Sequence, residues 1–128
     1  MKVLTIKQPY ASVIAAGLKE YEFRTWKTAY RGPILIHAGK SIDSEATAKF
    51  ACYGLDYPLG CIIARAELTD CVPVDEELRK TLRKKDFLIY SGTTENLQWR
   101  GYGFQLANIQ KIDPIFVNGK LGLWDYPE

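Results

Sequence analysis

A lysine, a glutamate and an arginine lie close together near the N-terminus, in the segment KEYEFRTW. Lys19, Glu22 and Arg24 can place one carboxylate beside two cations, and at a cleft such a cluster binds an anion or the edge of a nucleobase. The same residues also suit an exposed edge strand, where charged side chains prevent pairing with a second sheet and contribute little energy. From the residues alone, both interpretations stay open.

Aromatic and cationic residues are interleaved in the segment that follows. Trp26, Lys27, Tyr30 and Arg31 combine flat rings with positive charges, which suits base stacking and phosphate contact in a single-stranded nucleic acid. The same residues could form a loop whose rings fold back onto the core. The sequence does not separate these two interpretations.

His37 is the only histidine of the chain. It could titrate near neutral pH or hydrogen-bond a ligand, but a lone histidine on an apolar strand is more typical of a core residue whose hydrogen bonds are satisfied. The sequence shows no recognisable partners for a catalytic triad, no phosphate-binding glycine loop and no paired acids at a distinctive spacing.

The three cysteines, Cys52, Cys61 and Cys71, have spacings that match no close-pair zinc pattern. Free cysteines are most often buried, so we expect reduced, buried thiols. We therefore expect neither a disulfide framework nor a metal site, and nothing in the sequence indicates a cofactor.

Positive charge is concentrated at one end of the chain. Residues 1–40 hold seven cations and two anions, a net charge of +5, whereas residues 41–128 hold ten cations and thirteen anions, a net charge of −3. This asymmetry favours an anionic partner for the first region, and nucleic acid is the commonest such partner. The basic run from Arg79 to Lys85 instead suits a solvated helix end, where cations complement the helix dipole.

Size and composition indicate one ordinary globular domain over residues 1–128. The chain has a mass of 14.5 kDa, with 47% hydrophobic and 25% charged residues. No apolar run approaches the roughly 20 residues of a membrane helix, and the N-terminus lacks the pattern of a secretory leader. We therefore expect a soluble, cytoplasmic domain that does not contact a membrane.

Apolar alternation and turn residues predict strands connected by short helices. The predicted strands are 3–6, 19–26, 31–40, 60–68 and 99–112, and the predicted helices are 9–17, 41–54 and 74–85. A loop with Pro114 and Asn118-Gly119 is expected before the closing segment LGLW. The helices are too few and too scattered for a doubly wound sheet, so the pattern indicates an α+β fold with a curved sheet or small barrel.

The strand at 19–26 has a clear period of two. Tyr21 and Phe23 are predicted to face the core, while Glu22 and Arg24 share the opposite face and point outward. This predicted strand therefore presents its charges to solvent.

Several motifs in the same order resemble the activating signal cointegrator homology (ASCH) domain family. The segment KQPYASVIAAGLKEYEFRTW carries the Gly-x-Lys-x-x-Glu-x-Arg-x-Trp pattern from Gly17 to Trp26. RGPILIHAG resembles the second strand of the family, GCIIARAELTDCV its central strand and NIQKIDPIFVNGKLGLW its closing segment. The resemblance spans Leu4 to Trp124, and it implies a PUA-like fold: a small mixed β-barrel flanked by short helices.

The resemblance also implies a cleft beside the Gly-x-Lys-x-x-Glu-x-Arg segment that binds RNA or another single-stranded nucleic acid. We expect the cations of the region to contact phosphates, two aromatic residues to stack on bases, and polar residues to line the cleft. The expected phosphate contacts are Lys19, Arg24, Lys27, Arg31 and Lys40, the stacking residues Trp26 and Tyr30, and the polar residues Gln8, Glu22 and His37. A protein partner that uses the same cleft is a further possibility.

An enzymatic alternative comes from bacterial proteins of similar fold that remove the acetyl group from acetylated cytidine with a lysine, a threonine and a glutamate. Lys19 matches the lysine, but Glu22 stands where the threonine would be, so the hydroxyl nucleophile is missing. Glu67 could supply a carboxylate from the central strand, and Lys19 with Glu22 could activate water. We expect binding without catalysis, with an amidohydrolase acting on a modified nucleoside as the alternative.

Overall fold

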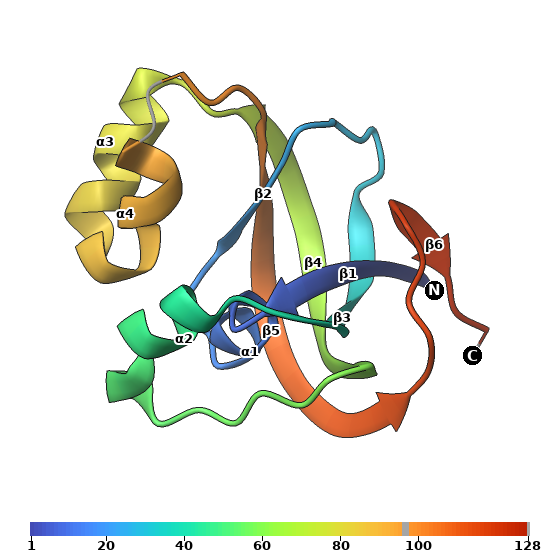
Figure 1. The fold of residues 1–128 in the computed structure, drawn as a ribbon. Helices are drawn as coiled ribbons and strands as arrows, with labels where there is room; N and C mark the ends of the chain where they lie inside the picture. The colour runs from blue at the N-terminus through green and yellow to red at the C-terminus, as the bar shows by residue number, and fades with distance from the viewer. Residues whose placement is uncertain (96–97, 128) are drawn as a thin grey trace.

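Six strands form one mixed sheet in the computed structural model, which describes residues 1–95 and 98–127 (Figure 1). The strand order is β2-β5-β4-β3-β1-β6; β1 and β3 are parallel, and the other neighbours are antiparallel. The strands are β1 (Lys2–Gln8), β2 (Tyr21–Arg24), β3 (Gly32–Ile42), β4 (Cys61–Pro73), β5 (Tyr102–Phe116) and β6 (Leu123–Asp125). The helices are α1 (Tyr10–Ala15), α2 (Ser44–Lys49), α3 (Glu76–Lys85) and α4 (Phe87–Glu95), with a 3-10 turn at Ala51–Tyr53.

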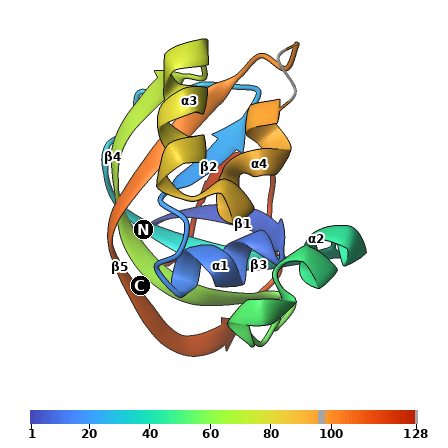
Figure 2. The ribbon, with the colours of Figure 1, turned by 90° about the vertical axis from the view of Figure 1, so that its left-hand side faces the viewer.

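The sheet curls because the two long strands β4 and β5 are not in regular register. Extra residues in a strand bend it and increase its twist. The register shifts lie between Ile62 and Ala64, between Arg65 and Glu67, and between Leu68 and Asp70. The strands wrap around α1 (Figure 2), but in the described residues no backbone pairing joins β2 to β1 or β6. The predicted α+β fold with a barrel-like sheet is confirmed; in the described residues, backbone pairing does not close the sheet completely.

The main core lies between α1 and the concave face of the sheet. Residues 11–15 of α1 are all buried, and the helix packs against four strands. Each large aliphatic side chain buried in this way contributes about 1.5–3 kcal/mol. The cluster includes Leu4, Ile6, Ile14, Ile34, Ile36, Leu68, Phe104 and Leu106. This packing fixes the end of α1, and therefore the start of the segment that leads into β2.

A second core covers the other face of β2. Phe23 packs edge-on against Tyr90 of α4, with ring centroids 6.2 Å apart, and Tyr21 joins the same cluster. Glu20 anchors the start of β2, because its N–H donates to the Tyr90 hydroxyl and its carboxylate accepts from Lys85 of α3 at 2.7 Å. Tyr21 and Phe23 therefore face apolar groups, as predicted.

Three local predictions are corrected by the structure. β4 continues past residue 68 to Pro73, and β5 runs through Pro114, where Ile112–Pro114 stand opposite Ile63 alone. A proline that cannot donate a ladder hydrogen bond is tolerated in such an irregularity. Cys52 is exposed, whereas Cys61 is buried, and burial raises the pKa of the Cys61 thiol.

The region of α3 and α4 also departs from the prediction. α4 has no counterpart among the predicted helices because its sequence, FLIYSGTTE, lacks an amphipathic period. Arg79, expected on a solvated helix end, is 5% exposed and donates to the Trp99 carbonyl at 2.6 Å. No helix in the described residues has the length and apolar character that crossing a membrane requires.

Gln8 joins three parts of the fold at the end of β1. Its Nε2 donates to Ser12 Oγ at 2.8 Å and to the Pro58 carbonyl at 2.9 Å, and its Oε1 accepts from the Ser12 N–H at 2.9 Å. The side chain is fully buried. These bonds use both amide hydrogens and the amide oxygen, so the Gln8 side chain is engaged within the fold.

We expect Gln8→Ala to lower the free energy of unfolding by about 2–4 kcal/mol, because it leaves a cavity and several buried polar groups without partners. Urea denaturation measures the change. Gln110→Ala is the matched control, since Gln110 is exposed on β5 and should change stability by less than about 0.5 kcal/mol. Equal losses in the two variants would show that the Gln8 network does not stabilise the fold.

Candidate functional site

The Glu22 carboxylate lies between two cations. Lys19 Nζ is 3.6 Å from Glu22 Oε1, and Arg24 donates to Glu22 Oε2 from Nη2 at 2.9 Å and from Nε at 3.1 Å. Glu22 is 8% exposed and Lys19 is 4% exposed. A buried carboxylate is stable only when it is paired and hydrogen-bonded, so each oxygen of Glu22 is committed to this cluster.

Arg24 extends the cluster across the opening of the sheet. Its Nη2 also donates to the Thr5 carbonyl of β1 at 2.6 Å. β3 pairs with one edge of β1 at Thr5, but β6 pairs with the other edge only from Lys2 to Leu4, so in the described residues that second edge has no strand beside it at Thr5. A side chain from β2 therefore spans the gap that the backbone leaves open. The prediction that Glu22 and Arg24 point into solvent is wrong for this reason.

Lys19 lies beneath two aromatic rings. Its Nζ is 4.6 Å from the ring centre of Tyr10 and 5.1 Å from that of Phe23. Burial lowers the pKa of Lys19 from its usual 10.5, while the nearby Glu22 carboxylate acts in the opposite direction. The ammonium group is thus held by Glu22 and by cation–π contacts.

A cleft of about 590 Å³ opens above this cluster, between β2, the end of β3 and β1. Lys7, Arg24 and Lys40 contribute positive charge, and Glu22, already paired, is the one acidic residue in its described lining. The cleft is therefore cationic. It is lined by Thr5, Lys7, Tyr10, Glu22, Phe23, Arg24, Thr25, Trp26, Gly39, Lys40, Ser41 and Trp99.

Two half-buried indoles form part of the cleft wall. Trp26 packs edge-on against Phe104 with ring centroids 5.1 Å apart, and Trp99 packs in the same way against Phe23 at 6.4 Å. Each ring therefore has one part fixed by the core and another part at the cleft. The sequence left two interpretations of Trp26 open, and both features are present: the ring packs against the core, and it also lines the cleft.

Four of the predicted binding residues line the cleft: Glu22, Arg24, Trp26 and Lys40. Lys19 is not in its described lining, and Tyr30 packs on the core with its hydroxyl donating to the Pro33 carbonyl. Lys19 therefore supports the cleft from below, and Tyr30 supports the fold.

The other predicted residues lie outside the cleft. Lys27 and Arg31 are exposed, with Arg31 donating to the carbonyls of Thr28 and Tyr30, and both stay predictions. His37 is buried in β3 beside a neighbouring hollow. Glu67 lies between buried Ala66 and Leu68, so it faces the outer side of the sheet and does not meet Lys19.

Sequence reasoning missed Lys7 and Trp99 as cleft residues. The alternation of apolar Leu4 and Ile6 with polar Thr5 and Lys7 is a signal that could have shown Lys7 on the outer face of β1. Trp99 has no such signal. Its position depends on Gly101, where an added Cβ would clash with the Trp99 ring and with the Arg24 carbonyl.

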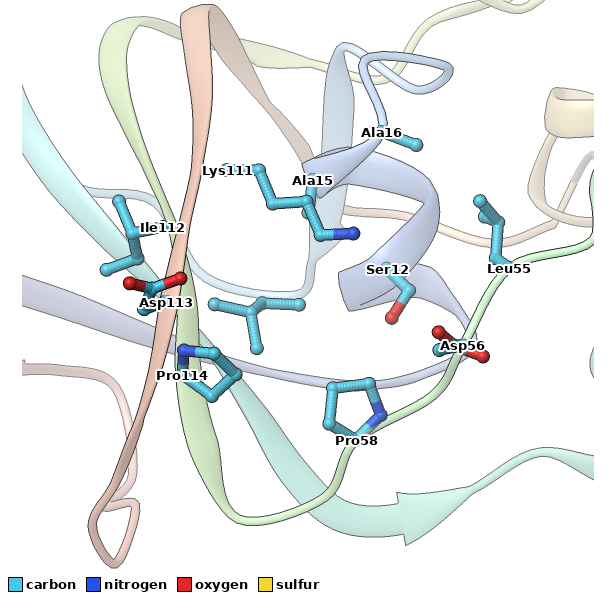
Figure 3. Close-up of a pocket in the computed structure, with 11 residues that line it drawn as sticks. Ser12, Ala15, Ala16, Leu55, Asp56, Pro58, Lys111, Ile112, Asp113 and Pro114 are labelled. Carbon is cyan, nitrogen blue, oxygen red and sulfur yellow. The ribbon is translucent and has the colours of Figure 1, made fainter.

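A separate apolar pocket of about 660 Å³ lies between α1, β5 and the loop before β4 (Figure 3). Its lining carries Asp56 and Asp113 with Lys111, whose side chain extends from β5 toward α1. Within the described residues, no group of three or more His, Cys, Asp and Glu residues is arranged to hold a metal ion.

Comparisons with known proteins agree on one family. The model described as "ASCH domain" matches residues 4–116. Activating signal cointegrator 1 of Homo sapiens and that of Mus musculus are each 35% identical to this chain over 81 residues, which is 54% of this chain and 14% of theirs. The chain thus matches a small part of these longer relatives.

Solved structures show the same fold. ASCH from Zymomonas mobilis has a TM-score of 0.57 at 21% identity, covering 90% of this chain and 72% of that chain. A mutant form of the same protein has a TM-score of 0.58 at 20% identity, covering 90% of this chain and 74% of that chain. At about 20% sequence identity, these comparisons show that the two proteins share a fold.

We expect burial of Lys19 to make stability depend on pH in the alkaline range. Because its folded pKa lies below its unfolded value, the unfolded chain binds more protons between the two values, and the free energy of unfolding rises with pH there. Wild type should therefore gain stability relative to Lys19→Met between about pH 8 and about pH 10 in urea denaturation.

Gln110→Met is the control for this comparison, because it replaces an exposed residue that does not titrate. Its difference from wild type should be the same at both pH values. A constant difference for Lys19→Met as well would contradict the assigned environment of Lys19.

Proposed function

The chain belongs to the ASCH domain family, and we propose that it is a module that binds single-stranded RNA in the cationic cleft between β2 and β1. The observation that carries the proposal is the combination in one cleft of Lys7, Lys40 and Arg24 with the half-buried indoles of Trp26 and Trp99. Cations that neutralise phosphates and aromatic faces that stack on bases are the two components of single-strand recognition.

Exposed lysines provide the phosphate contacts. Lys7 and Lys40 are exposed on β1 and β3, and Gly39 and Ser41 flank Lys40 in the cleft lining. Arg24 is committed to Glu22 and Thr5, so it adds positive potential but keeps its place in the fold. Since Glu22 is neutralised by its two partners, the cleft presents a net positive charge to an incoming phosphate.

The size of the cleft favours unpaired bases. Its volume of about 590 Å³ lies within the roughly 300–1,000 Å³ of pockets that enclose a small ligand. An unstacked base with its sugar fits such a volume, whereas a duplex would have to lie across the surface. Sequence-specific recognition of RNA generally uses bases that are splayed out and stacked on aromatic side chains.

An amidohydrolase remains the second candidate, because a buried lysine with a lowered pKa beside a carboxylate is a common feature of catalytic sites. Three observations weigh against it. Both oxygens of Glu22 are engaged, Lys19 is absent from the described cleft lining, and Glu67 lies on the other face of the sheet.

Incubation with acetylated cytidine, followed by chromatography for free cytidine and acetate, separates the two candidates. We expect no turnover, because Glu22 has no hydroxyl that could act as the nucleophile, and both of its carboxylate oxygens are paired with Lys19 and Arg24. Turnover that disappears in the Lys19→Met variant would replace the binding-only proposal with an enzymatic one.

We expect the double variant Lys7→Gln/Lys40→Gln to bind single-stranded RNA at least about tenfold more weakly than wild type. Fluorescence anisotropy with a labelled oligouridylate of about eight nucleotides, titrated at several salt concentrations, measures the change. Each lost phosphate contact should reduce the slope of log affinity against log salt by about 0.7.

Lys84→Gln is the matched control, since Lys84 is exposed on α3 and outside the cleft lining. It should leave affinity and salt slope almost unchanged, and thermal unfolding should show that all variants are folded. An equal loss in both variants, or wild-type affinity that is independent of salt, would place the binding surface elsewhere.

A further inference from the structure

A second hollow adjoins the RNA cleft. It has a volume of about 430 Å³, and it shares Thr5, Gly39 and Lys40 with the cleft. The two spaces therefore meet along β1 and β3, and Lys40 lies at the junction. The hollow is lined by Thr5, His37, Gly39, Lys40, Asn118, Gly119, Lys120 and Leu121.

The charge of the hollow matches that of the cleft. Lys40 and Lys120 contribute two cations, and its described lining contains no acidic residue. Lys40 Nζ is 3.4 Å from the Asn118 side-chain oxygen, and Lys120 Nζ lies over the Trp124 ring at 5.9 Å from its centre. Both lysines are exposed, so their ammonium groups are available to phosphates.

The floor of the hollow is polar and tightly packed. His37 is 1% exposed; its Nε2–H donates to the Val117 carbonyl at 2.7 Å, and its Nδ1 is buried with no hydrogen-bond partner among the described residues. Buried polar atoms without partners are rare. A Cβ at Gly119 would lie 2.7 Å from Thr5 Oγ1 and 3.0 Å from His37 Nδ1, so the backbone of this turn packs directly on the floor.

We infer that this hollow is a second subsite of the same RNA-binding surface. It takes the nucleotide next to the one held in the cleft, and Lys40 contacts the phosphate that joins the two, while Lys120 contacts the phosphate beyond. This inference rests on the proposed function. It adds that the surface recognises at least two consecutive nucleotides rather than one.

The charge of the two spaces favours continuation of the RNA strand into the second subsite rather than into the larger apolar pocket of Figure 3. That pocket carries Asp56 and Asp113 against Lys111 alone, and its walls are mostly apolar, with Ala15 and Leu55 among them. An anionic strand is repelled by such a rim. The second subsite, by contrast, is cationic like the cleft, because its described lining holds Lys40 and Lys120 and no acidic residue.

Oligouridylates of increasing length test the second subsite. We measure the affinity of wild type and of Lys120→Gln for uridine monophosphate, the dinucleotide and the tetranucleotide, by competition against a labelled RNA. Lys120→Gln should bind the monophosphate as wild type does, but it should bind the tetranucleotide roughly three to ten times more weakly. Lys111→Gln, which removes a lysine from the apolar pocket, is the control and should leave all three affinities unchanged.

The outcomes separate the subsite from the function on which it rests. If Lys120→Gln binds every length as wild type does while Lys7→Gln/Lys40→Gln is weakened, the second subsite is wrong and the RNA cleft stands. If Lys120→Gln weakens the monophosphate and the tetranucleotide equally, Lys120 belongs to the first site and the second subsite is again wrong. If wild type binds RNA of no length, both proposals fail together.

Discussion

The pairing of one buried carboxylate with two cations is the constraint on which the cleft depends. The described strands do not close the sheet through backbone pairing, so β2 and β1 need another connection. Glu22 provides it by holding Arg24, which reaches the Thr5 carbonyl of β1. Breaking a buried ion pair by removing one partner typically costs about 3–5 kcal/mol, because the remaining charge is left uncompensated. The separation of the two walls of the cleft is therefore set by this cluster.

The same constraint assigns different tasks to the charged residues of the region. Lys19, Glu22 and Arg24 satisfy one another and keep their places in the fold. The positive charge that a ligand can reach then falls to Lys7 and Lys40, which are exposed above the cluster. Both oxygens of Glu22 are paired, and Lys19 is not in the described cleft lining, so this pair is well suited to stabilising a cationic surface.

Local patterns predicted much of the fold, and contacts between distant segments account for what they missed. The period of two placed Tyr21 and Phe23 on a core face correctly, and the ordered motifs identified the family. The same period implied that Glu22 faces solvent, because sequence spacing cannot show that β1 lies across from that face. Trp99 was missed for a similar reason: its ring reaches the cleft through close packing at Gly101.

The indoles of Trp26 and Trp99 offer the most direct test of the central claim, that single-stranded RNA lies in the cleft held open by Glu22 and Arg24. Two-dimensional ¹H–¹⁵N NMR during titration with a short oligouridylate reports on each indole N–H separately. We expect large shifts for the indole signals of Trp26 and Trp99, which line the cleft, and for the backbone amides of Gly39 and Lys40. Shifts confined to residues around Lys111 and Asp56, with the Trp26 and Trp99 signals unmoved, would contradict it.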